Sequence, residues 1–296
     1  MRRMIIEMLL LLPALASGVA SALVPLIVPT PGHAQPATTA LPHIVSLNLC
    51  ADPYLMAFAA PEQVLALTPN SRDPEQSPFA ARAAGFPVTN GRMEDVIQLA
   101  PDLVILSPFS SVTRRQTFQR LGIETFTLNA ANDFAAAREE ILEIGAAIGR
   151  DAAARNYLAD LDAQMGSLDQ TNIPATLLNV QRRGLTAGTG HILDDIIMRA
   201  GAINLGRLAG DGMAPLSLEQ TIMLAPDYLL LIGTPPKAAD RGTELFAHPV
   251  LTQTYPPTRR ITLPGNLILC AGASTPLAVK SLQAALADQR PLGSPK

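Results

Sequence analysis

One pattern of residues occurs twice in this chain and constrains its fold more than any other feature. Residues 93–106 read MEDVIQLAPDLVIL, and residues 218–231 read LEQTIMLAPDYLLL. In each copy the spacing of apolar residues predicts a short amphipathic helix, which ends at a proline because the ring blocks the helical hydrogen-bond ladder. The apolar run after the aspartate predicts a buried strand. A helix–turn–strand unit used twice predicts two similar lobes, and clefts between lobes are common ligand sites.

The first 34 residues have the layout of a secretory signal peptide. Arg2 and Arg3 precede a long apolar stretch, and small residues stand before an expected cleavage after Ala34. Pro13 and Pro25 interrupt the apolar stretch, which disfavours the alternative of a retained membrane anchor. We therefore expect a soluble, monomeric protein that is exported to the periplasm by a cleavable signal peptide.

Charge and composition exclude one class of partner. The chain has a formal net charge of −3, and its basic residues form no stripe, so nucleic acid is not an expected partner. It is 48% hydrophobic, enough for a substantial core, but only 4% aromatic and without Trp. The chain is therefore poor in the flat rings that hold planar ligands.

Strands alternate with helices on both sides of a long proline-free segment. Residues 35–131 predict a first α/β lobe with a mostly parallel sheet, in which Asp52 caps the first helix. Residues 132–170 carry apolar residues at helical spacing and read as one long helix or two abutting ones; we take one long helix as the prediction. Residues 171–290 predict the second α/β lobe, and residues 291–296 a frayed tail.

Signatures of catalysis are missing. The chain has neither a Walker loop nor a G-x-S-x-G elbow, and Gly188-Thr189-Gly190 is only part of a dinucleotide fingerprint, better read as a plain turn. His43, His191 and His248 each stand at the start of an expected element or before a proline, and their spacing does not require them to converge on a metal. We predict no catalytic residue, no metal site and no cofactor.

Ligands of parallel α/β lobes bind the loops at the carboxyl ends of the strands. Several of these loops carry arginines, whose planar forks suit carboxylates, phosphates and other anionic oxygens. The alternative is that these arginines are solvated surface residues. The predicted ligand-binding residues are Asn48, Cys50, Arg72, Arg92, Phe109, Arg182, Arg183 and Cys270.

Cys50 follows the first expected strand and Cys270 follows the last, one in each lobe. A disulfide between them would tie the lobes and close a very long loop, which favours it in the chain-entropy model. Two free thiols at the cleft wall, or thiolates that contact a soft ligand, are the alternatives. A redox protein that uses both cysteines is the rival function, although thiol-exchange enzymes usually have their cysteines close together, as in C-x-x-C.

Over nearly all of its length after the signal peptide, the chain resembles the periplasmic substrate-binding proteins of ABC importers for iron–siderophores and cobalamin. HIVSLN is similar to the first strand of that family, MEDVIQLAPDLVIL to its most typical segment, and LTAGTGHILDDIIMRAGAINL to the start of its second lobe. The resemblance implies two Rossmann-like α/β lobes joined by one long helix, a ligand cleft between the lobes, and no catalysis.

The resemblance also implies a partner and a ligand class. In the family a surface glutamate from each lobe docks on arginines of the inner-membrane permease, and Glu94 and Glu219 occupy those positions. A plain helix-start role is the alternative, since negative charge is favoured there. The expected ligand is a ferric chelate of the siderophore type, with a corrinoid such as cobalamin as the alternative. Cobalamin-binding members use several aromatic rings, whereas Phe109 is the main aromatic residue of the cleft loops here, and SLNLCAD and LCAG depart from the usual cleft loops.

Overall fold

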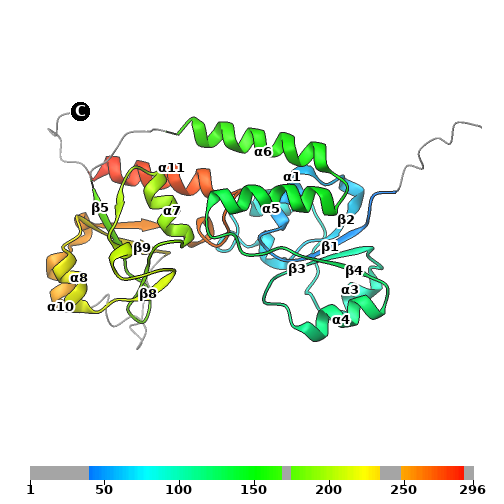
Figure 1. Ribbon diagram of the computed structural model, residues 1–296, viewed down its shortest axis with the longest axis horizontal. Coiled ribbons are helices and arrows are strands. Elements are labelled where there is room, and N and C mark those ends of the chain that lie inside the picture. The colour runs from blue at the N-terminus through cyan, green and yellow to red at the C-terminus, as the bar shows by residue number, and fades with distance from the viewer. Residues whose placement is uncertain (1–39, 169–174, 234–247, 290–296) are drawn as a thin grey trace, which may run out of the picture. The chain divides into compact units, whose positions relative to one another are not determined.

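The computed structural model describes residues 40–168, 175–233 and 248–289 (Figure 1). The predicted signal peptide, the tail and the second-lobe segment 234–247, which includes the strand-end loop at 234–237, lie outside the described residues. Within the described ranges, no helix combines the length and the apolar character needed to cross a bilayer.

The first lobe has a four-stranded parallel sheet. Its strand order is β2 (Val64–Ala66), β1 (Ile44–Leu47), β3 (Leu103–Leu106), β4 (Glu124–Thr127). The two inner strands are nearly all apolar because helices cover both faces of the sheet.

Alternate side chains of the inner strands point to opposite faces of this sheet. Ile44 and Ile105 pack with one group of helices, while Val45 and Val104 pack with another. The first group contains α1 (Asp52–Phe58), α5 (Phe134–Ala147) and α6 (Asp151–Gly166), and the second contains α3 (Met93–Gln98) and α4 (Val112–Arg120). A short helix, α2 (Ala80–Ala83), follows β2.

The connecting region holds two abutting helices, α5 and α6, which is the alternative that the sequence left open, and not the single long helix taken as the prediction (Figure 1). The chain breaks at Gly149, whose φ of +69° lies in the left-handed region that favours glycine. The two helices then pack closely, since a Cβ on Gly145 would lie 2.3 Å from the Cβ of Ala154. The second helix, α6, leads to the second lobe, and Met165 near its end packs against the apolar cores of both lobes.

The second lobe repeats the plan of the first. Its parallel sheet has the order β10 (Arg260–Leu263), β9 (Tyr228–Ile232), β5 (Thr176–Asn179), β7 (Ile203–Asn204). One face packs against α7 (Ile192–Arg199) and α11 (Thr275–Asp288), and the other against α8 (Leu218–Leu224) and α10 (Pro249–Thr254). Short 3-10 helices complete the described chain: η1 (Pro61–Gln63), η2 (Pro69–Arg72), η3 (Leu205–Leu208), η4 (Pro257–Arg259) and η5 (Gly265–Leu267).

An antiparallel ribbon of β6 (Leu185–Ala187) and β8 (Met213–Pro215) was not predicted. The glycine-rich segment around it packs backbone on backbone: a Cβ on Gly188 would lie 1.9 Å from the carbonyl oxygen of Gly210. Gly188 therefore serves close packing, which agrees with the plain-turn interpretation of Gly188-Thr189-Gly190.

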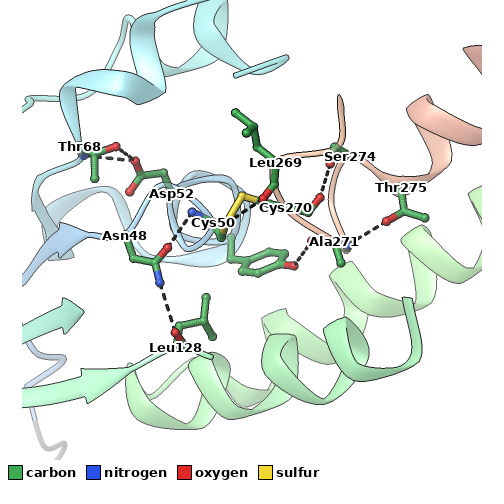
Figure 2. The surroundings of a disulfide bond; sticks show 12 residues. Asn48, Cys50, Asp52, Thr68, Leu128, Leu269, Cys270, Ala271, Ser274 and Thr275 are labelled. Carbon is green, nitrogen blue, oxygen red and sulfur yellow. Dashed lines mark hydrogen bonds between the residues drawn. A yellow bond between two sulfur atoms is a disulfide. The ribbon is translucent and has the colours of Figure 1, made fainter. Parts of the chain in front are cut away.

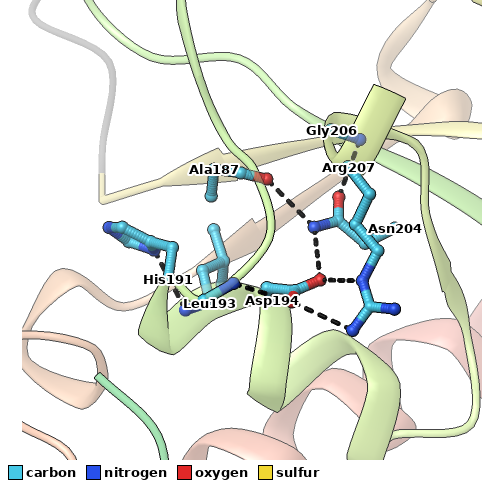
Figure 3. A network of polar contacts seen from close by, with 8 residues as sticks. Ala187, His191, Leu193, Asp194, Asn204, Gly206 and Arg207 are labelled. Carbon is cyan, nitrogen blue, oxygen red and sulfur yellow. Dashed lines mark hydrogen bonds and ion pairs between the residues drawn. The ribbon is translucent and has the colours of Figure 1, made fainter. Parts of the chain in front are cut away.

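An ion pair between the buried Asp194 and the exposed Arg207 fixes the same segment (Figure 3). Arg207 donates to Asp194 from Nε at 2.7 Å and from a terminal nitrogen at 3.1 Å, and Asn204 Nδ2 donates to the same carboxylate at 2.9 Å. Burial disfavours the ionised carboxylate, but these hydrogen bonds outweigh it and lower the pKa of Asp194.

The repeated sequence unit has one structural role in both lobes. Asp102 accepts a hydrogen bond from His43 N at 2.7 Å, and Asp227 accepts one from Thr176 N at 2.8 Å, so each aspartate holds the start of the neighbouring first strand. Just before each proline, Ala100 and Ala225 adopt positive φ values of 48° and 45°. These residues end α3 and α8 in the left-handed conformation common at helix C-termini.

Candidate functional site

The carboxyl edges of the two parallel sheets meet at a disulfide bond between Cys50 and Cys270 (Figure 2). Cys50 lies in the loop between β1 and α1, and Cys270 lies between β10 and α11. Of the three states that the sequence left open for these cysteines, the structure therefore contains the disulfide.

Tyr54 strengthens this junction by a contact with the residue after Cys270. Its hydroxyl donates to the carbonyl oxygen of Ala271 at 3.2 Å, and only 1% of the residue is exposed. Gly272 allows this contact, because a Cβ there would lie 2.0 Å from the Tyr54 hydroxyl oxygen. The ring also packs on Phe58 and Tyr157, which joins α1, α6 and the 270–275 loop in one contact region.

Three further contacts cross between the lobes. The backbone N–H of Phe134, at the start of α5, donates to Asp195 of α7 at 3.0 Å, while the Arg199 guanidinium lies 5.3 Å from the centre of the Phe134 ring. Asn266 Nδ2 donates to the carbonyl oxygen of Pro74 at 2.7 Å. Together with the disulfide, these contacts hold the two carboxyl edges at several separate points.

A small hollow that opens to solvent lies beside the disulfide. Its lining is largely apolar, with a few amide and hydroxyl groups. It is formed by Leu49, Cys50, Pro53, Gln76, Ser77, Pro78, Phe79, Asn266, Leu269, Cys270, Ala271, Ala273 and Ser274. The hollow is therefore shared by the two lobes.

Asp52 lies next to the junction but does not cap α1, which corrects the sequence prediction. It is the first residue of the helix, and its carboxylate accepts hydrogen bonds from the backbone N–H of Thr68 at 3.2 Å and from the Thr68 hydroxyl. Its other oxygen, Oδ1, is buried without a partner among the described residues. Burial raises the pKa of Asp52 to about 7, against the opposing effect of hydrogen bonds from Ser46 and Thr68.

Three of the predicted ligand-binding side chains are engaged within the first lobe. Asn48 is buried, donates to the carbonyl oxygens of Leu106 and Leu128, and accepts from Cys50 N at 2.9 Å (Figure 2). Arg72 donates to the carbonyl oxygens of Ala83 and Phe86. Arg92 pairs with Asp95 at 3.0 Å. These partners give each side chain a local structural role.

Three others project from the carboxyl edges. Phe109 follows β3 and is 88% exposed. Arg182 and Arg183 are exposed in the turn between β5 and β6, in the other lobe. The structure thus places these three residues at the predicted strand ends, Phe109 in the first lobe and the two arginines in the second.

Glu94 and Glu219 lie in equivalent positions. Each is the second residue of its short helix, α3 or α8, and each is exposed. The pKa of Glu219 is lowered, chiefly by a hydrogen bond from its own backbone N–H and then by the Ser217 hydroxyl. Since the N-terminus of a helix that precedes a parallel strand lies at the carboxyl edge of the sheet, both glutamates belong to that side of their lobes.

The described histidines form contacts with nearby residues of their own lobes. His43 contacts Asp102 at 3.1 Å, and the Nδ1 atoms of His191 and His248 accept hydrogen bonds from the first turns of their own helices. Among the described residues, no cluster of three or more histidine, cysteine or acidic side chains could hold a metal ion. Sequence reasoning missed Tyr54 and Gly272, since neither residue type signals a lobe contact without the fold.

One comparison with known proteins identifies the family of this chain. A sequence model described as periplasmic binding protein matches residues 44–264. A search among curated proteins finds no match.

Solved structures with the same fold include the apo form of the periplasmic heme-binding protein RhuT from Roseiflexus sp. RS-1 (24% identity, TM-score 0.66, covering 83% of this chain and 98% of that one). The heme-binding protein HutB of Vibrio cholerae is similar at 21% identity and a TM-score of 0.69, covering 82% and 98%. The vitamin B12-binding protein BtuF of Vibrio cholerae is similar at 17% identity and a TM-score of 0.55, covering 83% and 97%. At these identities the likeness establishes the fold.

Proposed function

Because the chain belongs to the periplasmic binding protein family, whose members bind solutes, we propose that it captures a ferric chelate of the siderophore type for an ABC importer. The observation that supports this most directly is the meeting of two parallel-sheet carboxyl edges at one junction, since ligands of such sheets bind at those edges. The proposal includes export by the predicted signal peptide, two lobes with boundaries at 35–131 and 171–290, and action as a monomer.

A chelate suits the described side chains better than a ligand whose iron needs protein coordination. Haem iron is held by residues such as histidine, tyrosine or a cysteine thiolate. In the described ranges, the histidines contact their own local partners, and both cysteines are oxidised. Tyr54 and Tyr255 are buried, the half-buried Tyr157 packs against the Tyr54 ring, and the Tyr228 hydroxyl donates to the carbonyl oxygen of Gln289. A siderophore supplies all the ligands of its iron, so the protein has only to recognise the outer surface of the complex. A corrinoid is the alternative ligand, in line with the fold shared with BtuF.

The ligand proposal is tested by thermal shift and native mass spectrometry of the purified protein. The panel contains ferric citrate, ferrioxamine B, a ferric catecholate, haem and cyanocobalamin. A ligand that binds only the folded state raises the unfolding temperature. Stabilisation by a ferric chelate supports the proposal, stabilisation by cyanocobalamin alone selects the corrinoid alternative, and a flat response to every compound contradicts both.

We also propose that Glu94 and Glu219 dock on the permease of the importer. Both are exposed, neither pairs with a cationic side chain among the described residues, and they occupy matching positions on the two lobes. Carboxylates in this arrangement suit two arginines of a two-sided partner.

The docking proposal predicts that Glu94→Ala with Glu219→Ala leaves ligand affinity unchanged while uptake falls at least about tenfold, as expected for the loss of charge-assisted contacts. A matched control is Glu124→Ala with Glu139→Ala, since these glutamates are exposed on β4 and α5. Uptake is measured in cells that express the cognate importer, and equal uptake by the two double variants would refute docking.

A further inference from the structure

The disulfide is a second covalent connection between the lobes. The first connection is the chain itself, which passes from α6 to the second lobe after Gly166. The disulfide joins Cys50 of the first lobe to Cys270 of the second, across a sequence separation of 220 residues. A body that is held at one point can rotate about it in every direction, whereas a body held at two points rotates only about the line through them. The disulfide therefore restricts how the lobes can move.

The two connections lie at separate places. Tyr54 links the region of the disulfide to α6, because its hydroxyl donates to the carbonyl oxygen of Ala271 and its ring packs edge-on against Tyr157. From Tyr157, α6 continues to Gly166, about 14 Å further along the helix axis at the usual rise per residue. The chain therefore leaves the first lobe at a point removed from the disulfide.

The segment that carries Cys270 is rigid. Ser274 Oγ donates to the carbonyl oxygen of Cys270 at 2.7 Å, and Gly272 N donates to the Thr275 hydroxyl at 2.9 Å (Figure 2). Thr275 begins α11, which packs in the core of the second lobe. Ala273, within the same segment, packs in the core of the first lobe. A displacement of Cys270 is therefore passed directly to α11.

Cys50 stands on a turn that is fixed in the same way. Its backbone N–H donates to Asn48 Oδ1 at 2.9 Å, and the backbone N–H of Ala51 donates to the carbonyl oxygen of Asn48 at 3.0 Å. Helix α1 begins immediately after this turn, at Asp52. The disulfide therefore joins two rigid segments, and neither can extend to let the lobes separate while the bond is intact.

The other contacts between the carboxyl edges are reversible. Asn266 Nδ2 donates to the carbonyl oxygen of Pro74, and Phe134 N donates to Asp195. A hydrogen bond is exchanged for one with water at a small net cost, so these contacts can open and re-form in the folded protein. Among the described contacts that cross between the lobes, the disulfide alone is covalent, and its state decides whether the edges can part.

An external thiol can reach the bond. Both cysteines are half-buried, and both line the hollow that opens to solvent. The chain has no third cysteine, so a thiol from outside the chain is needed for exchange. A dithiol attacks one Sγ to form a mixed disulfide, and its second thiol then displaces the protein sulfur. Cys50 and Cys270 take up two electrons and two protons to become thiols, and the dithiol is oxidised to a disulfide.

We propose that the Cys50–Cys270 disulfide is a redox-sensitive lock on the movement of the lobes, which an external dithiol opens. While the bond is intact, the lobes rotate only about the line through the disulfide and the end of α6. After reduction the carboxyl edges can separate and twist, which changes how the lobes enclose a ligand. The effect on a ligand rests on the proposed function, whereas the lock is tested without any ligand, so its failure would leave ligand capture standing.

Lobe movement is measured by single-molecule energy transfer on the purified protein. Gln119 of α4 and Gln253 of α10 are exposed, one in each lobe, and each is replaced by a ketone-bearing amino acid that takes a hydroxylamine dye and leaves the cysteines unlabelled. The forms compared are the oxidised protein, the protein reduced with dithiothreitol, and Cys50→Ser with Cys270→Ser. Asn266→Ala is the matched control, since it removes a non-covalent contact between the same edges and keeps the disulfide.

We expect a narrow distribution of transfer efficiencies for the oxidised protein and for Asn266→Ala. The reduced protein and the serine double variant should give a broader distribution that is shifted to lower efficiency. Linking the two reduced thiols with a short bis-maleimide should narrow the distribution again, whereas the unlinked N-ethylmaleimide adduct should keep it broad. Far-ultraviolet circular dichroism identifies a temperature at which all the forms are folded, so that unfolding is not mistaken for lobe movement.

Identical distributions for the oxidised and the reduced folded protein would overturn the lock. Access to the bond is measured by mass spectrometry after alkylation of the native protein in dithiothreitol, and we expect both cysteines to be alkylated. Reduction that occurs only after urea has unfolded the chain would overturn the inference as well, because a lock that opens must be reached in the native state.

Discussion

The contact between Tyr54 and Gly272 makes a prediction that the structure allows us to quantify. An alanine at position 272 keeps the backbone φ of +91°, and its Cβ would lie 2.0 Å from the Tyr54 hydroxyl oxygen and 3.1 Å from the Cβ of Ala137. Tyr54 would have to move and lose its hydrogen bond to Ala271. The free energy of unfolding should fall by about 1 kcal/mol for the positive φ, about 1–2 kcal/mol for the hydrogen bond and about 1–2 kcal/mol for disturbed packing.

Gly122→Ala is the matched control for this prediction. Gly122 has a similar φ of +74°, but a Cβ there would have no atom within 4 Å, so only the backbone effect of about 1 kcal/mol remains. The three contributions total about 3–5 kcal/mol, so at about 2–4 °C per kcal/mol for a protein of this size, Gly272→Ala should lower the melting temperature by about 6–20 °C and Gly122→Ala by about 2–4 °C. Calorimetry measures both. Equal shifts in melting temperature for the two variants would show that Tyr54 tolerates a Cβ at position 272. The description of the junction would then be wrong.

Two more predictions concern the junction. Reduction of the Cys50–Cys270 bond should destabilise the protein by up to about 5 kcal/mol in the chain-entropy model, because the sequence separation is 220 residues. Dithiothreitol should therefore lower the melting temperature of the wild type and leave that of the double variant Cys50→Ser with Cys270→Ser unchanged. Equal melting temperatures for the reduced and the oxidised wild type would contradict this. The pKa of Asp52 is raised from 3.8 to about 7, so the folded state retains a proton that the unfolded state releases, and stability should fall by a few kcal/mol as pH rises through that window. Asp52→Asn should reduce the dependence of the unfolding free energy on pH, measured by urea titrations at pH 4 to 8. The remaining dependence is due to Glu140, because burial raises the pKa of that residue to about 7 as well. An unchanged pH dependence would show that Asp52 is ionised in the folded protein.

The lobes and their parallel sheets were predictable because apolar periodicity and strand–helix alternation depend on local sequence. The form of the connecting region was not. The break between its two helices depends on the left-handed φ of Gly149 and on close packing between Gly145 and Ala154. The sequence alone does not distinguish these two glycines from glycines that a continuous helix tolerates. The ribbon of β6 and β8 was missed for a similar reason, since each strand has three residues and their pairing is set by tertiary contacts.

The sequence predicted where the candidate site lies more reliably than which residues form it. The sequence located the strand-end loops, but it could not tell an arginine with a local partner from one without. Arg92 pairs with Asp95 three residues later, whereas Arg72 donates to carbonyl groups more than ten residues away, which only the fold reveals.

Comparison of the two lobes within one chain separates residues that build the fold from residues that serve a partner. Asn48 and Asn179 both donate from Nδ2 to carbonyl groups of the neighbouring strand, at Leu106 and Leu230, so Asn48 has a structural counterpart in the other lobe. The same holds for Asp102 with Asp227.

Glu94 and Glu219 are repeated in the same way, yet neither supports a neighbouring strand. A repeated residue that makes the same hydrogen bonds within both lobes is explained by its role in folding. Glu219 accepts hydrogen bonds from its own backbone N–H and from the Ser217 hydroxyl, which is a helix-start role. The double variant of Glu94 and Glu219 therefore distinguishes a helix-start role, which would lower stability, from the docking proposed above, which would lower uptake alone.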